Sequence, residues 1–154
     1  MYSQQLPHID IVIIPISNPL KIGIYKNKTL IKEVTSKEMT SEFLPKFFDE
    51  VLKEYNIDNI IYTKGPGSYM SIKLTYIFLK TLQIVKNIEI FAVDGFYFNK
   101  NLPIKAIGNS AFVKENDTIT IKKVKSSNSF ELPQKLNFKD FSKEIEPLYI
   151  LNAV

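Results

Sequence analysis

The segment that decides the fold is NIIYTKGPGSYMSIK, residues 59–73. It begins with a β-branched and aromatic run of strand length, Asn59–Thr63, which is followed by the turn signal GPGS at residues 65–68. The apolar spacing then changes to that of a helix, which we expect over Ser71–Lys86. The segment therefore predicts a strand, a tight glycine-rich turn and a long helix in direct succession.

The turn between this strand and this helix has two interpretations. Free backbone N–H groups at the start of a helix can cradle a phosphate, which would make Gly65, Gly67 and Ser68 phosphate-binding residues. The residues match neither the Walker A pattern nor the dinucleotide fingerprint. We favour the simpler interpretation, a tight turn in which the glycines supply conformational freedom and Ser68 caps the helix.

Three strands and a helix are predicted upstream of this segment, and one strand is predicted downstream. The strands are expected over Ile9–Ile16, Lys21–Tyr25, Leu30–Thr35 and Ile88–Val93. The helix is expected over Thr40–Tyr55, after a Ser/Thr-rich entry that can cap its first turn. The order βββαβαβ predicts an α/β fold with a mixed sheet, in which the first three strands are antiparallel and crossovers add the others.

The pattern weakens after residue 100. Short strands are expected over Pro103–Gly108, Ala111–Glu115 and Thr118–Lys125, followed by a polar linker over Lys125–Ser129. A short helix is expected over Lys139–Ile145 and an extended segment over Pro147–Leu151. We therefore expect an N-terminal lobe over residues 1–99 and a reduced C-terminal lobe over residues 100–154.

Both predicted helices carry more apolar surface than one face of a sheet can cover. The apolar side chains of the first helix spread over about 180°, where a stripe of about 100° suffices. The second helix is apolar in nearly every direction, and Lys73 and Lys80 mark its only clearly polar edge. The extra surface is covered by the other helix, by the C-terminal segment or by another protein chain. The last alternative predicts a helix-on-helix interface of about 1,600 Å² in total.

The composition excludes several kinds of chemistry. All 20 basic residues are lysine, so the chain has no guanidinium clamp for phosphate or carboxylate. It has no cysteine and a single histidine, His8, which excludes a thiolate nucleophile and a histidine-rich metal centre. We expect no catalytic residue, no metal and no cofactor. The net charge of +4 comes from lysines spread along the whole chain, and no basic tract indicates a nucleic-acid-binding surface.

Two remaining candidates for catalysis are weak. Asp10, Asp94 and Asp117 lie at or near strand ends and could converge on a magnesium ion, but Asp10 opens its strand instead of ending it. Ser68 lacks a base partner, since nothing fixes His8 near it. No apolar run approaches the roughly 18 residues that span a bilayer, and we expect a cytoplasmic protein.

The segment at 59–73 resembles the signature of the TsaB (YeaZ) family, a strand followed by Gly-Pro-Gly-Ser-Phe-Thr-Gly-Leu-Arg and a long helix. The residues SEFLP at 41–45 are similar to the start of that family's preceding helix. The residues EPLYIL at 146–151 resemble its closing segment. The resemblance is specific over residues 41–86 and supportive at 146–151.

The resemblance implies a degenerate actin/Hsp70/sugar-kinase-like (ribonuclease H-like) fold and a part in making N6-threonylcarbamoyladenosine in tRNA. It implies a non-catalytic subunit whose partners are a TsaD-type threonylcarbamoyltransferase and a TsaE-type ATPase, or a second copy of itself. The partner surface that it implies lies on the two helices and comprises Phe43, Phe47, Tyr69, Met70, Ile72, Lys73, Tyr76, Leu79 and Lys80.

The sequence also departs from the family. PIS at residues 15–17 stands where the family has Asp-Thr-Ser, and Lys73 stands where it has arginine. Thr75, Ile77 and Leu79 occupy positions that are usually small, which implies an altered partner fit in a shortened member. The alternative function is a nucleotide-binding ATPase or phosphotransferase of the same fold that uses the GPGS loop. A peptidase is the least plausible, because the chain has one histidine and no cysteine.

Overall fold

The order of strands and helices along the first 93 residues matches the predicted βββαβαβ. A computed structural model describes residues 5–150, and in it β1 (His8–Ile14), β2 (Leu20–Lys26), β3 (Thr29–Ser36), β4 (Asn56–Thr63) and β5 (Glu89–Val93) form one sheet. The order across the sheet is β3-β2-β1-β4-β5. The first three strands pair antiparallel, whereas β4 pairs parallel with both β1 and β5. The two crossovers are made by helices.

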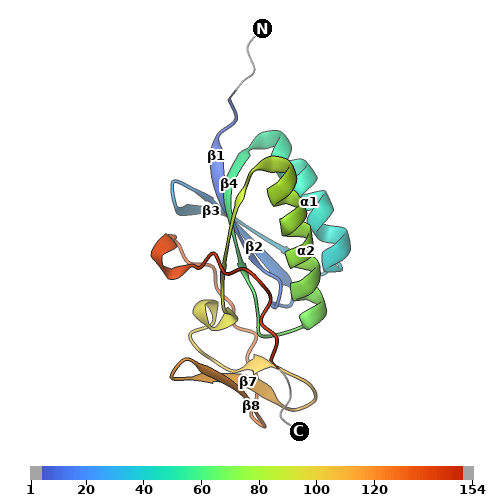
Figure 1. The fold of residues 1–154 in the computed structure, drawn as a ribbon, viewed down its shortest axis with the longest axis vertical. Helices are drawn as coiled ribbons and strands as arrows, with labels where there is room; N and C mark the ends of the chain where they lie inside the picture. The colour runs from blue at the N-terminus through green and yellow to red at the C-terminus, as the bar shows by residue number, and fades with distance from the viewer. Residues whose placement is uncertain (1–4, 151–154) are drawn as a thin grey trace.

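The helices α1 (Thr40–Glu54) and α2 (Tyr69–Lys86) cover one face of this sheet (Figure 1). Alternate side chains of β1 point to this face, and Ile9, Ile11 and Ile13 join Phe48 and Leu79 in a first hydrophobic core. α2 ends at Asn87, which adopts the left-handed conformation that closes many helices. Neither helix is long and apolar enough to cross a membrane, within residues 5–150.

The opposite face of the sheet is covered by most of the C-terminal segment, residues 126–150, which contains no α-helix and whose Ile145 packs against the first core. The other residues of β1, Val12 and Ile14, face this side. They pack in a second core with side chains from the 3-10 helix η1 (Gly95–Phe98) and from the C-terminal segment: Phe96, Phe98, Phe130, Leu132, Leu136 and Phe141. Because β1 is buried on both faces, it reads as a continuous apolar run.

The C-terminal segment crosses the sheet from one edge to the other. At the β3 edge, the backbone N–H of Leu30 donates to the carbonyl of Gln134 at 2.9 Å. At the β5 edge, Ala92 and Ser142 exchange two backbone hydrogen bonds of 2.8 and 2.9 Å. The predicted helix over Lys139–Ile145 is therefore wrong. Only the 3-10 turn η2 (Phe138–Asp140) forms, because the following residues pair with the sheet edge and bury Phe141.

A small antiparallel sheet lies at the far end of the molecule (Figure 1). It consists of β6 (Ile104–Lys105), β7 (Ala111–Glu115) and β8 (Thr118–Lys122), so the first and third predicted strands are shorter than expected. The division into lobes 1–99 and 100–154 stays a prediction. Residues 130–141 belong to the core of the main sheet, and only 104–122 form the separate sheet. Residues 147–150 have no regular secondary structure, and Leu151 lies outside the described residues.

Two buried tyrosines tie the C-terminal segment to the two faces of the sheet. The Tyr25 hydroxyl donates to the carbonyl of Pro133 at 2.6 Å, and the Tyr62 hydroxyl donates to the carbonyl of Ile145. Burial is the main cause that raises the pKa of both phenols above the ordinary value of about 10.

The raised pKa values predict a loss of stability in alkali. The folded chain keeps both phenols protonated, while tyrosines of the unfolded chain ionise near pH 10. The stabilisation is therefore complete below about pH 10 and is lost as the pH rises toward the folded pKa values. In urea unfolding from pH 8 to 11, we expect the free energy of unfolding to fall above pH 10. Tyr25→Phe should cost about 1 kcal/mol at pH 8 and make that fall shallower. An equally steep fall in Tyr25→Phe would contradict the assignment.

Candidate functional site

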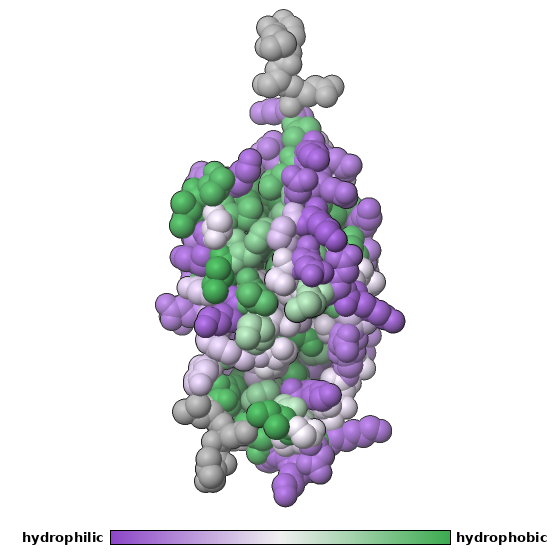
Figure 2. All heavy atoms as spheres, turned by 90° about the vertical axis from the view of Figure 1, so that its right-hand side faces the viewer, coloured by the Kyte–Doolittle hydropathy of each residue, from purple (hydrophilic) through white to green (hydrophobic). Residues whose placement is uncertain are grey.

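An exposed apolar stripe runs along α2. Met70, Ile77 and Ile84 follow one another at intervals of seven residues, so they lie on one side of the helix. The exposed fractions of their side chains are 65%, 51% and 82%, and Val85 beside them is 67% exposed. The helical side of the molecule shows hydrophobic surface along much of its length, next to a mostly hydrophilic region (Figure 2). A contiguous apolar patch of this kind marks an interaction surface more often than a free one.

The charged residues of α2 all have one sign. α2 carries Lys73, Lys80 and Lys86 and no aspartate or glutamate. The exposed residues of α1 include Glu42, Asp49, Glu50 and Glu54 together with two lysines, so the acidic side chains lie on the other helix. A complementary partner would present an apolar centre with acidic residues around it.

The structure divides the nine predicted partner residues into three groups. Tyr69, Met70 and Lys73 are exposed, and Phe43, Tyr76 and Lys80 are half-buried. The remaining three, Phe47, Ile72 and Leu79, are buried in the core between the helices and the sheet. Those three cannot contact a partner unless the helices separate from the sheet. The structure therefore does not place them on the surface, as the partner prediction requires.

Sequence reasoning missed Ile77, Ile84 and Val85, which are the most exposed apolar residues of the C-terminal half of α2. Apolar residues seven positions apart recur on this helix as Met70-Ile77-Ile84, Ile72-Leu79 and Phe78-Val85. The second one faces the sheet, together with the buried Thr75, whose hydroxyl donates to the carbonyl of Ser71 at 2.8 Å. The side of α2 that packs closely against the sheet is marked in the sequence by the small residue Thr75, between Ile72 and Leu79.

The GPGS loop is packed against apolar side chains. A Cβ atom on Gly67 would lie 2.5 Å from Cγ2 of Ile16, and one on Gly95 would lie 2.3 Å from Cδ1 of the same residue. Two carbonyls at the start of the loop also accept backbone hydrogen bonds. The carbonyl of Lys64 accepts from the N–H of Leu148 at 2.7 Å, and that of Gly65 accepts from the N–H of Gly95 at 2.9 Å. Ile16 therefore wedges between the two loops that follow β4 and β5.

Neither helix is capped as predicted. Ser68 occupies the N-cap position of α2 but makes no side-chain cap bond, and its hydroxyl lies 3.4 Å from that of Ser71. Met39 occupies the N-cap of α1, so the Ser/Thr-rich entry does not cap that helix. The backbone conformation of Gly65 and Gly67, with φ values of +124° and +157°, requires glycine together with the close packing of Gly67, and the part of the loop in phosphate binding stays a prediction.

The close contact between Ile16 and Gly67 predicts that mutations at these two positions have coupled effects on stability. Gly67→Ala should lower the free energy of unfolding by about 1–3 kcal/mol, because the new methyl group overlaps Ile16. In the background of Ile16→Ala the same change should cost less, since the closest atom, Cγ2 of Ile16, is gone. The cost that remains comes from Cβ of residue 16 at 2.9 Å and from the positive φ of Gly67. Urea unfolding of the wild type, the two single variants and the double variant measures this coupling. Additive effects would mean that Ile16 does not set the requirement for glycine.

The candidate catalytic groups do not come together. Asp10 lies near the start of β1 and accepts from the Asn59 side chain at 2.8 Å, whereas Asp94 follows the last residue of β5, at the opposite end of the parallel strands. Burial is the main cause that raises the pKa of Asp10. Asp94 pairs with Lys114 at 2.6 Å and accepts from the N–H of Phe96 at 3.0 Å. No group of three His, Asp or Glu side chains that could hold a metal occurs in the described part of the chain.

His8 and Ser68 are also held apart. His8 pairs with Asn56 at the first residues of β1 and β4, while Ser68 follows the last residue of β4. An eight-residue strand separates them, which corresponds to about 25 Å. The imidazole of His8 contacts Asp58 at 2.7 Å instead. The geometry supplies no nucleophile–base pair at Ser68.

A cleft of about 850 Å³ opens between the GPGS loop, the turn after β1, the small sheet and the C-terminal segment. Tyr69 and Tyr149 stand at one side of it with ring centroids 5.3 Å apart, in an edge-to-face arrangement. The described wall is lined mainly by apolar residues and contains no aspartate or glutamate.

Comparison with known proteins shows similarity at the level of structure. No protein-family model matches the chain, and no curated protein matches it. A solved structure described as YeaZ from Pseudomonas aeruginosa superposes with a TM-score of 0.56, over 75% of this chain and 64% of that chain, at 10% sequence identity. The chain has the YeaZ (TsaB) fold. A second structure, described as an uncharacterized protein with similarity to peptidase YeaZ from Pseudomonas aeruginosa, has a TM-score of 0.50 at 11% identity, over 75% of this chain and 63% of that one.

The likeness to YeaZ confirms the predicted YeaZ-like α/β fold with a mixed sheet. The chain spans less than two thirds of the length of these two YeaZ-like structures. At 10–11% identity the likeness establishes the fold and leaves the function to be argued from the surface of this chain.

Proposed function

We propose that this chain is a non-catalytic subunit of the cytoplasmic machinery that makes N6-threonylcarbamoyladenosine in tRNA. It binds a TsaD-type threonylcarbamoyltransferase through the stripe Met70-Ile77-Ile84 of α2, and a TsaE-type ATPase joins the assembly. The transferase contacts the tRNA, so this chain meets the tRNA only indirectly.

The exposed stripe is the observation that carries this proposal. Leaving Met70, Ile77, Ile84 and Val85 in water is unfavourable, by about 25 cal/mol for each Å² of apolar surface. Covering the stripe with a partner recovers that free energy. The YeaZ fold and the resemblance of the signature segment support the choice of partner. The separation of His8 from Ser68 and of Asp10 from Asp94 supports a role without catalysis.

The direct test mixes the purified chain with the TsaD-type transferase of the same organism. Size-exclusion chromatography with light scattering should show a complex with the summed mass of the two chains. With the TsaE-type ATPase, ATP, an activated threonylcarbamoyl donor and tRNA added, the mixture should modify the tRNA, and omitting this chain should abolish the modification. Separate elution of the two proteins, or modification that does not need this chain, would refute the proposal. The chain alone should show its own mass or twice that mass, and in the second case the transferase should compete with the dimer.

The alternative is an ATPase or phosphotransferase that uses the GPGS loop, and it predicts that the isolated chain binds ATP. Ile16 packs against Gly67, and the described wall of the cleft offers no carboxylate for a magnesium ion. We therefore expect no heat of binding when Mg·ATP is titrated into the isolated chain by calorimetry. Binding with a Kd below about 1 mM, together with ATP turnover, would favour the enzyme instead.

A further inference from the structure

The cleft beside the GPGS loop has the dimensions of a small-molecule site. Its volume of about 850 Å³ falls in the range of about 300–1,000 Å³ that is typical of ligand pockets. Its walls come from four parts of the chain: the turn after β1, the start of α2, the small sheet and the C-terminal segment. The stripe on α2 does not line it, so the cleft is a second feature that the proposed function leaves unused.

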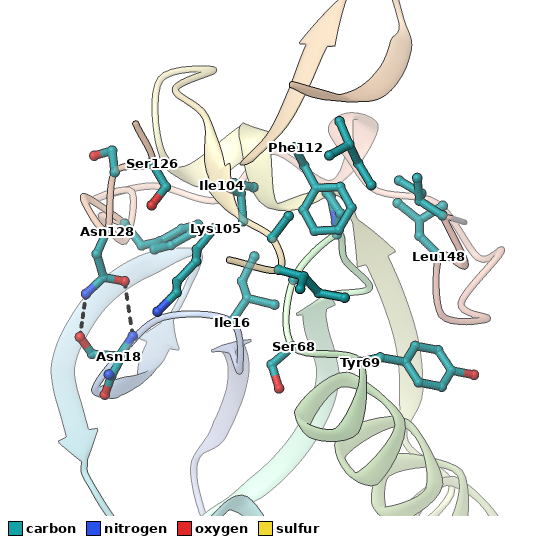
Figure 3. Close-up of a pocket in the computed structure, with 18 of the residues that line it drawn as sticks. Ile16, Asn18, Ser68, Tyr69, Ile104, Lys105, Phe112, Ser126, Asn128 and Leu148 are labelled. Atoms are coloured by element: carbon teal, nitrogen blue, oxygen red, sulfur yellow. Dashed lines mark hydrogen bonds between the residues drawn. The ribbon is translucent and has the colours of Figure 1, made fainter. Parts of the chain in front are cut away.

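The two sides of the cleft differ in polarity. In Figure 3, Lys105, Asn18, Asn128 and Ser126 lie on one side, and Phe112 and Leu148 lie on the other. Ile16 and Ile104 stand between the two sides. A ligand that fills this space would contact polar groups at one end and apolar side chains along the rest of its length.

The polar side is held in place by hydrogen bonds between distant parts of the chain. The backbone N–H of Asn18 donates to Oδ1 of Asn128 at 3.2 Å, and the amide nitrogen of Asn128 donates to the carbonyl of Asn18 (Figure 3). These bonds join the turn after β1 to the C-terminal segment. The part of the rim that carries Asn18 and Asn128 is therefore preorganised, which lowers the entropy cost of binding.

The charge of the cleft favours an anion. Lys105 is the one charged residue of the described lining, and no carboxylate within residues 5–150 lies within ion-pair distance of it. An ammonium group beside an apolar cavity attracts a carboxylate or sulfonate and repels a cation. The cavity then prefers a molecule with one anionic head and an apolar body.

We propose that this cleft binds an amphipathic anion, a molecule with a single anionic head at Lys105 and an apolar body between Ile16, Ile104 and Phe112. The proposal does not depend on the transferase, and it can be tested on the isolated chain.

A fluorescent fatty acid, 11-(dansylamino)undecanoate, is a suitable probe, and its methyl ester has the same body without the charge. The acid should bind saturably with a blue-shifted emission, and the ester should bind about five- to tenfold more weakly. Lys105→Gln should weaken binding of the acid by about the same factor and leave the ester unchanged. Lys123→Gln, at an exposed lysine outside the cleft, is the matched control and should change neither.

Amide chemical shifts locate the bound probe. Titration should move the signals of Gly67, Lys105 and Ala106, which line the cleft, and leave those of Ile77 and Ile84 in place. Absence of saturable binding, equal affinity of acid and ester, or an unaltered Lys105→Gln variant would overturn the proposal. Shifts confined to Ile77 and Ile84 would also overturn it, because the probe would then bind to the apolar stripe.

Discussion

Ile77→Asp should leave the chain folded and abolish its binding to the TsaD-type transferase, whereas Leu79→Asp should unfold the chain. Ile77 is half in solvent, so a carboxylate there stays hydrated and should cost less than about 1 kcal/mol of stability. Leu79 is fully buried between α2 and the sheet. Aspartate at that position loses the packing of leucine and buries a charge without a partner, which should cost more than about 4 kcal/mol.

The effect of Ile77→Asp on binding should be large because the residue lies at the middle of the stripe. A carboxylate desolvated at the centre of an apolar interface costs about 2 kcal/mol or more, which is at least about thirtyfold in Kd. Circular dichroism and urea unfolding measure the fold, and light scattering with the transferase measures the complex. Lys53→Gln, on the exposed face of α1, is a control that should bind normally. A folded Ile77→Asp variant that still forms the complex would place the contact elsewhere.

These two residues also show where the sequence stops being informative. The helix itself was predictable, because strand length, the GPGS turn and the apolar spacing all agree over residues 59–86. Its rotation was not, because Ile72, Ile77, Leu79 and Ile84 are equally apolar. The choice between them is made by tertiary packing: Thr75 is small enough to let α2 approach the sheet, and that places Ile77 outside.

The second layer of the fold was predicted poorly for a related reason. The C-terminal segment covers one face of the sheet without forming a regular element, so no periodicity marks it. Its apolar anchors are isolated residues such as Phe130, Leu136 and Phe141, separated by polar ones. Their partners include Val12 and Ile14 of β1, more than a hundred positions away. Contacts between residues so far apart in the chain produce no local sequence pattern, so they could not be predicted from the sequence.

Phe130→Ala should therefore destabilise the whole chain, by about 3–5 kcal/mol. The ring is 2% exposed and packs in the second core. The backbone carbonyl of Phe130 also accepts from Lys21 at 2.5 Å, so the segment stays attached while the cavity forms. Urea unfolding should show one transition at a lower midpoint. Ser129→Ala, at the exposed neighbour, should shift it by less than about 0.5 kcal/mol. A loss below about 1 kcal/mol in Phe130→Ala would mean that residues 126–150 are an appendage and that the main sheet is stable with one face uncovered.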